Sequence, residues 1–149
     1  MGNRTLFLWK MMCILFPLIA VWGGSVVQSL VLVKPFNFLS ELLPRIGQTF
    51  LAALPFLFLF LFVRRQMKSS NNAAIKGARW AGVSVLIFST FLWGCYYYDA
   101  IFRVGGGPNI GLGILLLFSP ICSVGVMLIS FHLVKIAVAR RPHVSIFDK

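Results

Sequence analysis

Four long runs of uncharged, mostly apolar residues alternate with short charged segments along the chain. They cover residues 11–33, 46–63, 80–98 and 104–134. A helix needs roughly 20 apolar residues to cross the ~30 Å hydrocarbon core of a bilayer, so each run is long enough to span one, the second only just. Because backbone groups inside a bilayer find no water to bond, the runs are predicted to be helices.

The pattern therefore predicts an all-α integral membrane protein, a four-helix bundle in which residues 1–149 form a single domain. The fourth span is expected to begin at Pro108, because the glycines at 105–107 disfavour a helix whereas proline is tolerated in a first turn. Pro120 then lies in mid-span and predicts a kink. We place the spans at about residues 11–33, 46–63, 80–98 and 108–134.

The spans differ in what they offer to their neighbours. In the first, small and polar residues recur at helical spacing, which predicts a face that packs against another helix: Ala20, Gly24, Ser25 and Gln28. The second is bulky and apolar on every side beyond Thr49, so we expect it to be the most lipid-exposed, with a bend at Pro55.

The segment between the first two spans has helical spacing of its own. Asn37 is a candidate N-cap, and Pro35 and Pro44 bracket the apolar residues Phe38, Leu39, Leu42 and Leu43. This spacing predicts a short interfacial helix that lies on the membrane in the first outer loop.

Positive charge is distributed very unequally between the segments that flank the spans. If both termini and the loop around residues 66–78 face the cytoplasm, that side carries eleven of the 14 Lys and Arg, and the other side carries only Lys34, Arg45 and Arg103. The positive-inside rule therefore predicts that both the N-terminus and the C-terminus are cytoplasmic, in a multi-pass protein of a bacterial inner (plasma) membrane. The net charge of +11 is expected to meet anionic lipid headgroups rather than nucleic acid.

Groups that could carry out chemistry are few. The carboxylates are Glu41, Asp99 and Asp148, and the imidazoles are His132 and His143. None is predicted at mid-membrane depth, so we expect no catalytic residues, no metal site and no cofactor, and no buried charge for coupled transport. The three cysteines form no C-x-x-C pair.

The most distinctive cluster lies at the predicted outer ends of the third and fourth spans, around the glycines at 105–107. Its members are Tyr96, Tyr97, Tyr98, Asp99, Arg103 and Asn109. One interpretation is structural: an aromatic belt, a surface ion pair and a flexible hairpin. The other is a partner-binding edge, since Tyr and Arg are enriched at interfaces.

Two classes of function follow from these features. The first is a non-catalytic membrane protein, not an enzyme, that binds another membrane component, such as an immunity protein against a pore-forming toxin or a small subunit of a membrane complex. Immunity proteins against pore-forming bacteriocins include small basic four-helix bundles that this chain resembles in architecture. The alternative is a small channel, carrier or lipid-linked sugar flippase.

Overall fold

The protein is all-helical over the residues that the computed structural model describes, which are 2–33, 38–68, 71–103 and 109–140. Four helices are long and apolar enough to cross a membrane, as predicted: Leu6–Val31, Leu42–Gln66, Asn72–Phe102 and Ser119–Ala139. The elements are α1 (Gly2–Pro17), the π-helix η1 (Leu18–Gly23), α2 (Gly24–Val31), α3 (Phe38–Gln66), α4 (Asn72–Phe102), α5 (Ile110–Leu117) and α6 (Ser119–Ala139).

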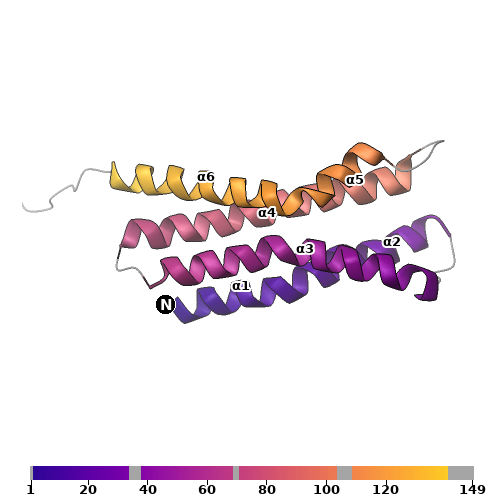
Figure 1. The fold of residues 1–149 in the computed structure, drawn as a ribbon, viewed down its shortest axis with the longest axis horizontal. Helices are drawn as coiled ribbons and strands as arrows, with labels where there is room; N and C mark the ends of the chain where they lie inside the picture. Colours follow the sequence, from indigo (N-terminus) through magenta and orange to yellow (C-terminus); the bar gives the residue numbers. More distant parts are fainter. Residues whose placement is uncertain (1, 34–37, 69–70, 104–108, 141–149) are drawn as a thin grey trace, which may run out of the picture.

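The long helices lie side by side, and α1, η1 and α2 form one continuous rod (Figure 1). The start of α1, the end of α3, the start of α4 and the end of α6 share one end of the bundle, which we call the proximal end. The ends of α2 and α4 and the starts of α3 and α5 share the other, the distal end (Figure 1). Helix α4 packs most extensively against α6, and α3 contacts α1, α4 and α6.

Of the four candidate spans, the one in α3 has the largest share of buried residues. Ala52, Phe56, Leu59 and Val63 are at most 1% exposed. The prediction that this span is the most lipid-exposed was wrong, because a helix that is apolar on every side has an apolar face for every neighbour as well as for lipid. The helix also continues through Pro55.

Small residues line the contact between α4 and α6. An added Cβ at Gly77 would lie 3.0 Å from the backbone oxygen of Phe131, so the two backbones approach closely there. Such approach is the usual basis of helix association in membranes, where no hydrophobic effect drives it. The other small buried residues of the two helices are Ala74, Ala78, Ala81, Gly82 and Ser89 on α4, and Ser119 and Ser123 on α6.

The first rod meets α4 at two places, and each is an aromatic ring packed against a glycine. The ring of Trp9 occupies the space that a Cβ on Gly82 would need, and the ring of Tyr97 does the same at Gly24. The second contact lies beside η1, where Tyr97 donates a hydrogen bond to the carbonyl oxygen of Val21.

The interfacial helix predicted before the second span is not a separate element. Residues from Phe38 onward form the first turns of α3, which continues through Pro44. A continuous helix leaves fewer backbone groups unbonded than a break would, and this favours continuation beside a bilayer. The predicted cap Asn37 and the predicted bracket Pro35 lie outside the described residues.

The fourth span is divided into two helices. Phe118 separates α5 from α6, and Pro120 lies in the first turn of α6, which places the predicted kink just before the proline. Proline has no N–H to give to the carbonyl four residues earlier, so the helix is weakest there. The first described helical residue of this span is Ile110, with Asn109 as its N-cap, whereas Pro108 was predicted to begin it and lies outside the described residues.

Candidate functional site

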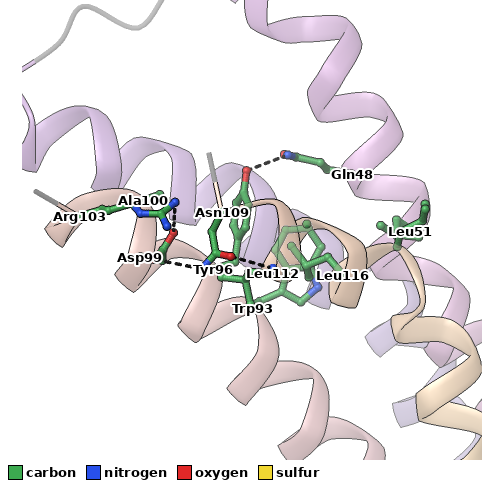
Figure 2. Close-up of a pocket in the computed structure, with 12 residues that line it drawn as sticks. Gln48, Leu51, Trp93, Tyr96, Asp99, Ala100, Arg103, Asn109, Leu112 and Leu116 are labelled. Carbon is green, nitrogen blue, oxygen red and sulfur yellow. Dashed lines mark hydrogen bonds and ion pairs between the residues drawn. The ribbon is translucent and has the colours of Figure 1, made fainter. Parts of the chain in front are cut away.

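A pocket of about 630 Å³ lies at the distal end, between α3, α4 and α5 (Figure 2). The interruption at Phe118 lets α5 take a direction of its own, and α5 packs on α4 and α6. The pocket is lined by Gln48 and Leu51 of α3, by Trp93, Tyr96, Asp99, Ala100 and Arg103 at the end of α4, and by Asn109, Leu112, Gly113, Leu116 and Leu117 of α5 and its cap.

Three polar residues connect α4 to α5 on one side of the pocket. Arg103 Nη1 lies 3.7 Å from Asp99 Oδ2, an ion pair across one helical turn. Asn109 donates from Nδ2 to Asp99 Oδ1 at 3.4 Å, while its own Oδ1 accepts from the backbone N–H of Leu112 at 3.1 Å. Asn109 therefore caps α5 and ties it to α4, and both ionic side chains stay partly exposed to a ligand.

A second polar group comes from α3 and faces the first across the pocket. Gln48 donates from Nε2 to Tyr96 Oη at 3.2 Å (Figure 2). Its Oε1 accepts from Arg45 Nη1 at 3.1 Å. The sequence analysis missed Gln48. The signal that could have found it is an amide inside an otherwise apolar run, three residues after Arg45.

The rest of the lining is aromatic or aliphatic. Trp93 is 4% exposed, and its ring lies 5.8 Å from that of Tyr96 in an edge-on arrangement. Together with the leucines of α3 and α5 it gives the pocket an apolar base beneath a polar rim. Such a pocket suits a ligand that has both an apolar and a polar part.

Not all of the predicted edge lies at this pocket. Tyr97 does not line the pocket: it is buried and donates to the carbonyl oxygen of Val21 at 2.7 Å, with Ser25 Oγ 3.5 Å from its hydroxyl. Tyr98 is 67% exposed, stacks on Phe102 and lines a different cavity of about 560 Å³, which Asp99 and Asn109 also border. The glycines at 105–107 lie outside the described residues.

The predicted packing face of the first rod is divided in a similar way. Gly24 and Ser25 lie against Tyr97, and Ser25 also donates to the carbonyl oxygen of Val21. Gln28, one turn further on, is partly exposed. Among the described residues, no group of three His, Cys, Asp or Glu side chains is arranged to hold a metal ion.

No protein-family model, curated protein or solved structure matches this chain.

Proposed function

We propose that this protein is a non-catalytic integral membrane protein that acts by binding another membrane component, above all another membrane protein, at the distal pocket. The observation that carries the proposal is the concave site itself, with its polar rim and its apolar base. Its polar side chains form hydrogen bonds with one another, which fixes their positions and suits recognition of a partner. An immunity protein against a pore-forming toxin and a small subunit of a membrane complex are the two forms of this function that we favour.

The residue types around the pocket support a protein partner. Trp, Tyr and Arg are the residues that most often carry binding energy at protein interfaces, particularly where an aromatic side chain forms part of a desolvated pocket. Here Trp93 and Tyr96 form one wall, and Arg103 stands at the rim with its side chain 39% exposed. A partner that inserts an apolar side chain and offers a polar group to Asp99 or Arg103 would use both parts of the site.

The experiment is capture of a partner by the tagged protein after extraction in mild detergent, followed by mass spectrometry. Asp99→Ala and Arg103→Ala are expected to reduce the yield of a stoichiometric partner at least tenfold. Lys76→Ala is the matched control, because it removes an exposed charge from the proximal end of the same helix. Equal capture by all variants would refute the site, and repeated absence of any partner from the unmodified protein would favour the channel, carrier or flippase alternative.

The orientation of the bundle is part of the same proposal. Arg64 and Arg65 at the end of α3, Lys76 and Arg79 near the start of α4, and Lys135 near the end of α6 belong to helix ends that gather at the proximal end (Figure 1). The positive-inside rule then makes the proximal end cytoplasmic, where anionic headgroups would meet these bases, and the distal pocket outward-facing.

Reporter fusions test this orientation. Alkaline phosphatase fused after Lys149 should be inactive, and fused after Asn37 it should be active, as expected for a multi-pass protein of a bacterial inner membrane with both termini inside. The reverse pattern would place the pocket in the cytoplasm and would overturn the orientation.

A further inference from the structure

A groove of about 450 Å³ follows the other side of α4, where α1 and η1 run beside it. It is separate from the distal pocket, and of the residues that line it only Trp93 borders both. Its walls are Met12, Leu15, Phe16, Ile19, Ala20 and Gly24 on the first rod, and Leu86, Thr90, Trp93, Gly94 and Tyr97 on α4.

The two aromatic-on-glycine contacts explain why the groove exists. At Trp9 and Gly82, and again at Tyr97 and Gly24, the helices are close enough for a ring to fill the gap. Between these contacts the facing residues include Ala20 and Gly94, and an added Cβ on Gly94 would meet no atom within 4 Å. The helices are therefore joined at these two points, with too little side-chain volume between the points to fill the space.

The groove offers a ligand very little polarity. Both walls belong to the helices Leu6–Val31 and Asn72–Phe102, which are candidate membrane spans. The hydroxyl of Tyr97 already donates to Val21 O. Because an unpaired polar group is costly to bury in hydrocarbon, whatever fills this groove in a bilayer must be apolar.

The length of the groove selects among apolar occupants. From Leu86 to Tyr97, α4 rises about 16 Å at ~1.5 Å per residue. Half of a ~30 Å hydrocarbon core is about 15 Å, so the groove is as long as one leaflet is deep. A spanning helix of a partner or of a second copy would need the full thickness and a width of about 10 Å, whereas a single acyl chain has the right length and is narrow enough.

We propose that the groove holds one acyl chain of a membrane lipid, drawn from the leaflet at the distal end. The chain lies between α1 and α4, supplies the dispersion contacts that the small side chains leave unmade, and joins the two helices along the stretch between their glycine contacts. Leu15 and Ile19 stand at the mouth of the groove, 45% and 69% exposed, where they would cover the chain's outer side.

Native mass spectrometry of the full chain tests the proposal. The protein is reconstituted with one synthetic phosphatidylglycerol, extracted in detergent and washed before measurement. The unmodified protein should retain one lipid molecule. Ala20→Phe and Thr90→Phe, which fill the groove from opposite walls, should each lower the retained fraction at least tenfold without lowering the melting temperature.

Ile129→Phe is the control, because Ile129 lies on α6, away from the groove, and is 62% exposed. It should retain lipid as the unmodified protein does. Absence of bound lipid from the washed unmodified protein, or equal retention by both groove variants and the control, would overturn the proposal. A dimer that both groove variants abolish would also overturn it, by showing that a second copy occupies the groove.

Discussion

Tyr96 and Tyr97 are neighbours in the sequence and their rings are in edge-on contact, yet they bind different parts of the molecule. Tyr96 faces the distal pocket and accepts a hydrogen bond from Gln48, in a group that includes partly exposed charges. Tyr97 is 9% exposed, covers Gly24 and donates to the carbonyl of Val21. One tyrosine belongs to a surface that a ligand can reach, and the other belongs to the contact that joins α4 to the first rod.

The difference shows that the role of an aromatic residue at a membrane interface depends on the backbone opposite it. Gly24 leaves room for a ring, and the neighbouring π-helix presents a carbonyl to its hydroxyl. Opposite Tyr96 there is an amide side chain at the edge of a pocket instead. Variants on the two sides should therefore separate stability from binding.

The largest effect is expected from Gly24→Leu. The added side chain would overlap the Tyr97 ring, and overpacking of this kind costs typically ~1–3 kcal/mol. The thermal melting temperature in detergent should fall clearly. Gly23→Leu is the control, because an added Cβ there would meet no atom within 4 Å. Equal losses at both glycines would contradict the close contact between α2 and α4.

A smaller effect is expected from Tyr97→Phe, which keeps the ring and removes the donor to Val21 O. Hydrogen bonds between helices in membranes are worth about 0.6–2 kcal/mol, so the melting temperature should fall less than for Gly24→Leu. Tyr98→Phe removes a hydroxyl from an exposed ring and should leave melting unchanged. If Tyr98→Phe lowers the melting temperature as much as Tyr97→Phe does, the buried hydrogen bond contributes nothing to stability.

The smallest effect on stability is expected from the variants that should abolish binding. The pair of Asp99 and Arg103 is partly exposed, and such pairs contribute only ~0–1 kcal/mol. Asp99→Ala and Arg103→Ala should therefore melt close to the unmodified protein while losing the captured partner. If either variant melts lower than Tyr97→Phe does, the pocket rim is part of the structural core, and the division between the two sides of α4 fails.

Much of the fold could be predicted from the sequence, because the length and apolarity of the runs are enough to predict spanning helices. The kink before Pro120 follows from the missing N–H of proline in the same direct way. The extent to which α3 is buried could not be predicted. Phe56 and Phe58 are the same residue type two positions apart, yet one is fully buried and the other 42% exposed. In a bilayer, the apolarity of a residue does not reveal whether it faces another helix or lipid.

The candidate site was only partly visible for a related reason. Asp99, Arg103 and Asn109 stand out by their chemistry and their spacing, so they could be singled out from the sequence. Gln48 and Trp93 lie at the same pocket because of how α3 and α5 pack. The direction of α5 depends in turn on where the fourth span breaks. Local spacing also could not reveal the π-helix η1, or that Tyr97 bonds the carbonyl of Val21 within it while Tyr96 lines the pocket.

The close contact between α4 and α6 can form only late in translation. The N-terminal half of a chain is made first, and α6 is the last of the four spanning helices to be synthesised. Until α6 is synthesised, the small residues of α4 around Gly77 and part of the buried surface of α3 lack the helix that packs on them. A chain released before residue 119 would carry three of the four spanning helices and lack the one that packs most extensively on α4. A premature stop would therefore leave an incomplete surface for membrane proteases to recognise.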